Sequence, residues 1–299
     1  MRILVNDNPI YPGPVTLRES VFEYCPILSF TLNTPAYAEV FTLEIQDKLD
    51  FVPVKIEQVN ASSYQYTCYP KSYIDFLQIL TSPINLIGTL EDLLNALAVG
   101  KFDLLHKTQE THWIYASMRG KTLIERLTQH VKAVDGGCPT FHFGMDGTLL
   151  FSDILSECLS EACGYVSGTI TKFGSSTSFE NLYPGTVRFH FFDENTYESQ
   201  KATYLESSGN VNLYRYVVSE DRKELEIRKM QSQFWRKYVA NTLMTMENTQ
   251  NSVVSPGLKV RNTNTNDEFV CITTVSSFES GGVQTTLELF PCVKTNQVL

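Results

Sequence analysis

Residues 111–153, THWIYASMRGKTLIERLTQHVKAVDGGCPTFHFGMDGTLLFSD, carry the clearest local structure in the chain. The aromatic segment around Trp113 and Tyr115 predicts a strand, Gly120 a turn, and Lys121-Thr122 the beginning of a helix. Apolar residues recur along that helix at spacings of four, four and three, which predicts one buried face, made of Leu123, Leu127, Val131 and Val134. The stretch therefore opens as a strand followed by an amphipathic helix.

The second part of this stretch predicts a β-hairpin. Glycines at 136–137 interrupt the helix, and Asp146-Gly147 then separates two apolar runs. Asp-Gly supplies the positive φ angles that a tight hairpin turn needs. We therefore expect a strand–helix–hairpin unit of the kind found in assembly modules.

The sequence MDGTLLF within the hairpin also resembles the DxDGT motif of haloacid-dehalogenase-type phosphatases. In those enzymes the first aspartate attacks phosphorus. Gly144 stands at that position here, so the mechanism has no attacking group. The hairpin turn explains Asp146-Gly147 without catalysis.

Composition indicates a β-rich chain of two or three domains. Its 299 residues are 42% hydrophobic, 12% aromatic and only 19% charged, the last value below the usual quarter. Low charge with many Asn, Ser, Thr and Tyr is common on surfaces that become buried in a larger assembly, although an ordinary β-rich monomer has the same composition.

The charge balance argues against direct nucleic-acid binding. The net charge is −9, and the basic cluster between Arg222 and Lys237 is interleaved with Glu224 and Glu226. A protein that grips phosphates needs a basic face. An acidic channel surface that lets a polyanion pass without binding is compatible with the net negative charge but does not follow from it.

Targeting, membrane and cofactor signals are missing from the sequence. We expect no signal peptide and no membrane insertion, because no apolar stretch approaches the roughly 18 residues of a membrane helix. The seven cysteines are scattered without a CxxC pair, so we expect free thiols and no metal site. Without GxGxxG or GxxxxGK[ST], no cofactor is expected.

Hydrophobic periodicity divides the chain into four segments. Residues 1–70 contain strands at eight- to twelve-residue spacing, which suggests a barrel or a sandwich as the first domain. Val54, Ile56 and Val59 nearly alternate there with polar residues, which predicts a strand with one buried face and one solvated face. Residues 71–162 predict an inserted α+β domain. Residues 163–221 return to strands, and 222–299 predict a long helix followed by a second small β unit.

The inserted domain begins with a second amphipathic helix. Leu90, Leu93, Leu94 and Leu97 share one face, Thr89 is the predicted N-cap, and Asp92 occupies the capping-box position.

The long helix is expected to run from Asp221 to about Met246. Four large side chains form its apolar stripe and are the candidate interface, between domains or between subunits: Met230, Phe234, Trp235 and Tyr238. Packing within the chain alone is the alternative explanation of that stripe, and Met or aromatic residues at this spacing are more often core than cofactor contacts.

Residue patterns for hydrolases are weak. Cys138 and His142 would share a strand face about 13 Å apart, too far for a nucleophile–base pair, and no GxSxG occurs. Paired carboxylates such as Glu91/Asp92, Asp193/Glu194 and Glu224/Glu226 are explained as solvated. We therefore predict no catalytic, cofactor-binding or metal residues.

The order of elements resembles the baseplate hub proteins of contractile-tailed phages, the family that also supplies the base of type VI secretion spikes. The resemblance rests on TLEDLLNAL, the KTLIERL helix, the DGTLLFSD hairpin, SPGLKVRN after the long helix, EFVCITTVSSF and TTLELF. It spans about residues 89–290 and, more loosely, the first 70.

The resemblance implies a fold class and a set of partners. The fold would be β-rich α+β, with two small tube-type β-barrels and the inserted α+β domain. Residues 1–70 and the return strands of 163–221 would form the first barrel, residues 71–162 the insertion, and 222–299 the long helix plus the second barrel. The function would be a non-enzymatic structural hub, a homotrimer that adapts the hexameric tail tube to a trimeric central spike. Its partners would be itself, the tail-tube protein, the spike protein and baseplate wedge proteins, in the tail of a virion assembled in the host cytoplasm.

Two alternatives to the hub remain open from the sequence. One is another structural tail component, such as a tube initiator or a wedge protein. The other is a hydrolase with an unmarked site.

Overall fold

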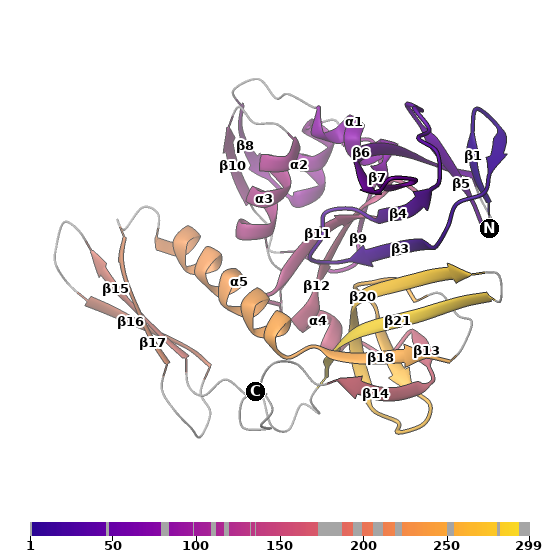
Figure 1. Cartoon of the computed structure of the whole chain (residues 1–299). Coiled ribbons are helices and arrows are strands. Elements are labelled where there is room, and N and C mark those ends of the chain that lie inside the picture. The colour runs from indigo at the N-terminus through magenta and orange to yellow at the C-terminus, as the bar shows by residue number, and fades with distance from the viewer. Residues whose placement is uncertain are drawn as a thin grey trace.

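The computed structural model describes residues 2–45, 48–78, 84–97, 99–108, 112–116, 120–131, 133–134, 136–172, 187–193, 199–205, 212–218, 223–249, 254–279 and 282–292. A large curled sheet dominates it, and helices cover one side of the molecule (Figure 1). The β-rich α+β class that the sequence predicted is confirmed, whereas the closure of two separate barrels stays a prediction.

The large sheet has two halves. The N-terminal half contains β1 (Arg2–Val5), β2 (Asn8–Ile10), β3 (Val15–Ser20), β4 (Ile27–Leu32), β5 (Phe41–Glu44), β6 (Lys48–Asn60) and β7 (Ser63–Pro70). The C-terminal half contains β13 (Gly164–Val166), β14 (Gly168–Lys172), β18 (Met244–Asn248), β19 (Lys259–Asn262), β20 (Glu268–Glu279) and β21 (Gly282–Pro291).

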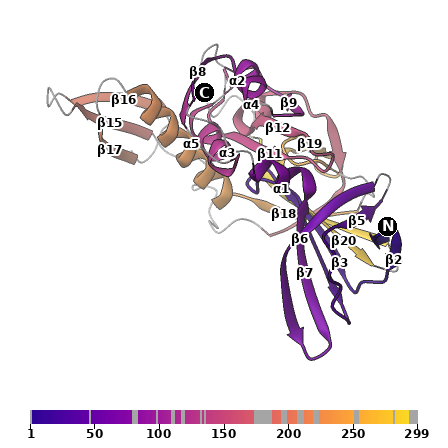
Figure 2. The ribbon, with the colours of Figure 1, turned by 90° about the horizontal axis from the view of Figure 1, so that it is seen from above.

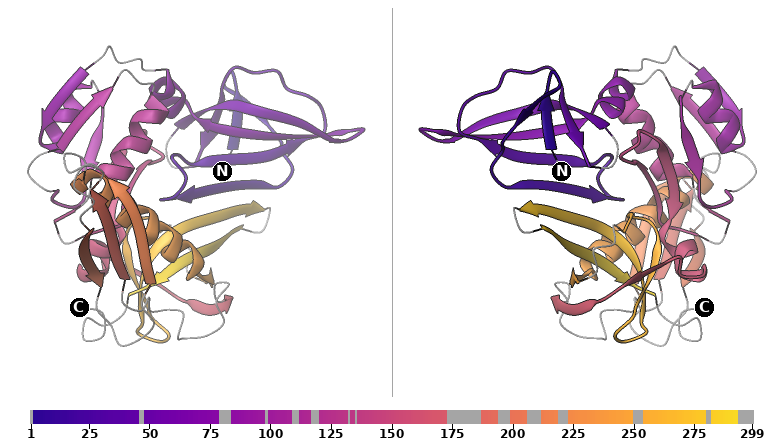
Figure 3. Two further views of the ribbon diagram at one scale, coloured as in Figure 1. Left: turned by 90° about the vertical axis from the view of Figure 1, so that its left-hand side faces the viewer. Right: turned by 90° about the vertical axis from the view of Figure 1, so that its right-hand side faces the viewer.

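One pair of strands joins the halves into a 13-stranded sheet. β3 and β20 are antiparallel neighbours from Val15↔Phe278 to Ser20↔Thr273. The N-terminal half lies above the C-terminal half in Figure 3, and the α/β part lies at one side of both. Each half has its own buried core, one around Phe30, Phe41 and Tyr66 and the other around Met246 and Leu287.

The α/β module lies between the two halves in sequence. Its helices are α1 (Lys71–Leu77), α2 (Leu90–Ala96), α3 (Gly120–His130) and α4 (Ile154–Leu159). Its strands are β8 (Ile84–Gly88), β9 (Phe102–Leu104), β10 (His112–Ala116), β11 (Pro139–Phe143) and β12 (Leu149–Asp153). The predicted capping box is confirmed, since Thr89 and Asp92 bond reciprocally at the start of α2.

The predicted strand, helix and hairpin of residues 111–153 are β10, α3 and the β11–β12 pair. Gly147 has φ +80°, as the hairpin requires. Leu123, Leu127 and Val131 are buried. Val134 is 56% exposed, because α3 ends at His130 and the chain then turns away; the prediction that it belongs to the buried face was wrong.

The remaining strands pair differently from the predicted return to the first barrel. β14 pairs with β18, and β13 with β19, both in the C-terminal half. The three strands β15 (Val187–Asp193), β16 (Ser199–Leu205) and β17 (Asn212–Val218) form a sheet of their own. That sheet stands apart beyond the end of α5 (Figure 1). The division of the chain at 70, 162 and 221 stays a prediction.

The long helix, α5 (Lys223–Asn241), is shorter than predicted at its C-terminal end. The Thr242 hydroxyl donates to the carbonyls of Tyr238 and Val239, and strand β18 begins two residues later. Met244 and Met246 alternate with exposed residues and fill the core of the C-terminal half. The alternation of buried and less buried residues at this point is that of a strand, so the helix ends earlier than its apolar stripe predicted.

Hairpin β6–β7 projects beyond the sheet (Figure 2). Val54, Ile56 and Val59, predicted as the buried face of a strand, are 42%, 42% and 59% exposed. The prediction of a dry face was wrong for the isolated chain, because this part of β6 extends past the elements that could cover it.

A buried carboxylate holds the end of the hairpin in the α/β module. Asp153 is fully buried, and its Oδ1 accepts N–H groups of Gly137, Cys138, Leu155 and Ser156 at 3.1 to 3.4 Å. A Cβ on Gly136 would lie 2.3 Å from this carboxyl group. Asp153 therefore fixes both the Gly-Gly break and the start of α4.

We expect Asp153→Ala to lower the free energy of unfolding by about 3 kcal/mol, because several buried N–H groups lose their acceptor. Urea denaturation measures this change. The matched control is Asp103→Ala, at an exposed position of β9, which should change stability by less than about 0.5 kcal/mol. Equal losses in the two variants would contradict the central role of Asp153.

Candidate assembly surfaces and interdomain contacts

The predicted interface stripe on α5 lies over the junction of the module and the C-terminal half. Trp235 is 5% exposed and belongs to a buried cluster with Ile154, Ile272 and Phe290. The Tyr238 ring lies 5.6 Å from the Trp235 ring and 6.3 Å from the Phe290 ring. Trp235 and Tyr238 therefore pack within their own chain, between domains.

The side chains of Met230 and Phe234 lie outside the part of the chain that the structure describes. On the neighbouring turn, the Ser232 hydroxyl donates to the carbonyl of Thr128 in α3 at 3.0 Å. Helix α5 thus contacts the module along one side. A contact of the stripe with a second subunit stays a prediction.

A polar network, which the sequence analysis missed, ties α4 to the C-terminal half. Glu157 in α4 accepts the backbone N–H of Lys259 at 2.8 Å, and Nε2 of His106 lies 3.1 Å from its other oxygen. The Lys259 ammonium donates to the carbonyls of Cys158 and Ser160 and lies 2.8 Å from Glu268. Glu157 and Lys259 are nearly buried.

The network holds both acids in their charged form. Burial pushes the pKa of Glu157 up, but His106 and the Lys259 N–H pull it further down, so the pKa lies below its usual value. Lys259, and then Arg261, lower the pKa of Glu268. Nothing in the spacing of His106, Glu157 and Lys259 along the sequence signals that they meet.

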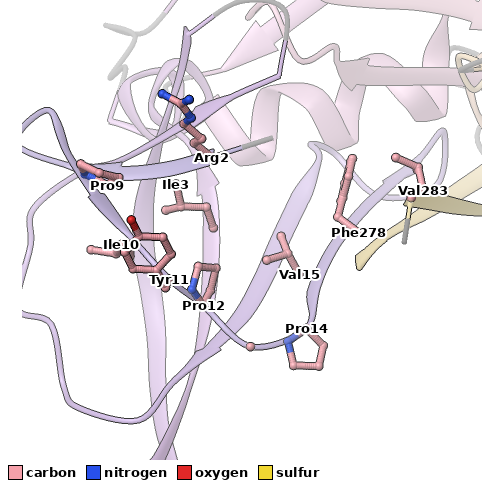
Figure 4. Close-up of a pocket in the computed structure, with 12 residues that line it drawn as sticks. Arg2, Ile3, Pro9, Ile10, Tyr11, Pro12, Pro14, Val15, Phe278 and Val283 are labelled. Atoms are coloured by element: carbon pink, nitrogen blue, oxygen red, sulfur yellow. The ribbon is translucent and has the colours of Figure 1, made fainter. Parts of the chain in front are cut away.

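An open groove lies where the N-terminal hairpin meets the tip of β20–β21 (Figure 4). Its volume is about 1150 Å³, and its lining includes Arg2, Ile10, Tyr11, Phe278 and Val283. Tyr11 is 91% and Val283 46% exposed. The groove therefore spans both halves of the sheet, with polar and apolar surface in similar amounts, and Arg2 is the one charged residue among the described residues that line it.

The residues tested for catalysis have structural roles. The Asp146 carboxylate contacts the Lys101 ammonium and accepts from Thr148 in the hairpin turn. Cys138 and His142 are buried; burial raises the pKa of the thiol and lowers that of His142 to about 4. Both shifts favour neutral side chains, the opposite of a thiolate–imidazolium pair.

Within the described ranges, no group of three or more His, Cys, Asp or Glu side chains is placed to hold a metal ion. None of the helices described is long and apolar enough to cross a membrane.

The fold is that of bacteriophage tail proteins. In particular, the chain is similar to a tail protein from Neisseria meningitidis MC58 (TM-score 0.64, 12% identity, 97% of this chain and 95% of that chain). It is also similar to the 43 kDa tail protein of prophage MuSo2 from Shewanella oneidensis (TM-score 0.65, 10% identity, 97% and 98%).

A third similar structure comes from a secretion system. It is an E. coli type VI secretion component described as structurally similar to the T4 bacteriophage tail proteins gp27 and gp5 (TM-score 0.51, 11% identity, 100% of this chain and 79% of that chain). No family model and no curated protein matches the sequence. The resemblance expected from the element order is thus confirmed as a shared fold.

The junction of the two sheet halves carries a titratable group. Glu19 of β3 lies opposite Thr274 of β20, and burial raises its pKa to about 7. The folded chain thus binds this proton more tightly than the unfolded chain, whose carboxyl has the ordinary pKa. Its contribution to stability therefore falls as the pH rises through the range between these two pKa values.

We expect Glu19→Gln to raise the free energy of unfolding at pH 8 by about 2 kcal/mol and to have little effect near pH 4, because the amide cannot ionise. Thermal or urea unfolding across this pH range measures the difference. Glu247→Gln, at an exposed position of β18, is the control and should leave the pH profile unchanged. A pH-independent effect of Glu19→Gln would refute the assignment.

Proposed function

We propose that this chain is a structural baseplate hub of a phage tail, which adapts the hexameric tail tube to a trimeric central spike. The observation that carries the proposal is the shared fold with two tail proteins over 97% of the chain. The similarity to a type VI secretion component related to T4 tail proteins gp27 and gp5 favours the hub over other tail parts.

The two-part sheet supports the symmetry that this function needs. Each half has its own core, and the two are joined through β3 and β20. If each half acts as one small tube-type barrel unit, three copies present six units to a hexameric tube. A closed ring of three identical chains can therefore match a six-fold tube on one side and a three-fold spike on the other without an additional adaptor protein.

The proposed hub uses its exposed apolar surfaces for assembly. The β6–β7 hairpin exposes Val54, Ile56 and Val59, and Tyr11 and Val283 are exposed in the groove. Apolar side chains grouped on a surface mark interaction sites. The proposed partners are further copies of the chain, the tail-tube protein, the spike protein and the wedge proteins. The proposed role requires no catalysis or cofactor, and its location is the virion tail.

We expect three copies of the chain in each purified tail particle, counted by quantitative mass spectrometry against a protein of known copy number. The expectation follows from the trimer, which meets a hexameric tube through two units per chain. Six or more copies would indicate a wedge or tube component and would overturn the hub. Absence of the chain from the tail would overturn any structural tail role.

We expect Phe234→Asp to leave a folded chain that is excluded from the trimer, because a charge in a subunit contact costs its desolvation. Native mass spectrometry and particle incorporation measure the loss. Lys237→Asp, at an exposed position of the same helix, is the control and should still assemble. A Phe234→Asp variant that assembles normally would remove the α5 stripe from the subunit interface.

A further inference from the structure

Two free thiols that are far apart in sequence meet between α4 and the end of β21. Cys158 lies in α4, and Cys292 follows β21 directly. Both are unpaired and partly exposed, and both pack against the cluster of Trp235, Ile154 and Phe290. Both side chains therefore lie against one small cluster, and the Cys292 thiol is the first cause of the raised pKa of Cys158, ahead of burial, as expected of neighbouring thiols.

The backbone holds the two cysteines there independently of their side chains. The Lys259 ammonium donates to the carbonyl of Cys158 at 2.9 Å and lies 2.8 Å from the Glu268 carboxylate. The N–H of Cys292 donates to the backbone carbonyl of Glu268 at 2.9 Å. The side chain of Lys259 and the backbone of Glu268 thus each hold one of the two segments, and the partly buried Lys259–Glu268 pair joins them.

We propose that Cys158 and Cys292 form an intrachain disulfide when the protein meets a low-molecular-weight disulfide such as oxidised glutathione. The thiolate of one cysteine attacks the reagent and releases one reduced thiol. The second cysteine then attacks the mixed disulfide and releases the other. The protein loses two protons and two electrons, and the reagent gains them as two thiols.

The other cysteines are less well placed for this reaction. Cys25, Cys68, Cys138 and Cys271 are buried in the packed interior. Cys163 is exposed, and its thiol donates to the carbonyl of Lys259 at 3.3 Å. Cys163 is therefore the natural control, since it lies near the same lysine but is reachable from solvent.

The bond would link the α/β module covalently to the last strand of the C-terminal half. It would close a long loop, which reduces the conformational freedom of the unfolded chain. The Lys259–Glu268 pair already links the two segments in the folded chain. The oxidised form should therefore resist unfolding more strongly, and this holds whether or not the hub function is correct.

The test is oxidation of the purified full-length protein with oxidised glutathione at mildly alkaline pH, where more thiolate is present. Remaining thiols are alkylated, and peptide mapping identifies the linked residues. We expect two thiols to be lost, a cross-linked peptide joining Cys158 to Cys292, and a melting temperature about 5 °C higher. Reduction should reverse all three changes.

Cys158→Ser and Cys292→Ser should each prevent the internal bond and the thermal shift and leave at most a glutathione adduct on the remaining cysteine, whereas Cys163→Ser should retain the bond and the shift. Stable glutathione adducts on Cys158 or Cys292 of the unsubstituted protein, in place of the internal bond, would overturn the proposal. A bond to any other cysteine, or unchanged thiols in the folded protein, would overturn it as well.

Discussion

The carboxylate of Asp153 is the interaction on which the junction of the module depends. It accepts five N–H contacts, from Ala133, Gly137 and Cys138 on one side and from the first turn of α4 on the other. A buried charge is tolerable only when it is saturated in this way. The position of α4, and with it Glu157 and Cys158, follows from that carboxylate.

Helix α4 is in turn bonded to the large sheet. Glu157 holds the backbone of Lys259 in β19, and Lys259 holds Glu268 at the start of β20. β20 then runs across to β3 and joins the N-terminal half. The module is therefore tied to the whole sheet, because helix α4 connects through Lys259 and its partly buried ion pair with Glu268 to β20, the strand that joins the two halves.

Local structure was predictable where one physical rule acts alone. The Asp146-Gly147 turn and the Thr89–Asp92 capping box follow from backbone angles and orphan N–H groups, and both were located from the sequence. Partners across the fold were not, since period-two alternation identifies a strand without naming its neighbour. The pairing of β14 with β18, and the meeting of His106 with Glu157, therefore appear only in three dimensions.

The error at Val54, Ile56 and Val59 has a different cause. Their alternation predicts burial, yet they are exposed in the isolated chain. Alternation of apolar and polar residues indicates that one face of a strand becomes buried. It does not show whether the same chain or another protein buries that face. If the chain is the proposed hub, neighbouring proteins cover the β6–β7 hairpin, and the pattern describes the assembled particle. The same reasoning separates this hairpin from the α5 stripe, where Trp235 and Tyr238 already have partners within the chain.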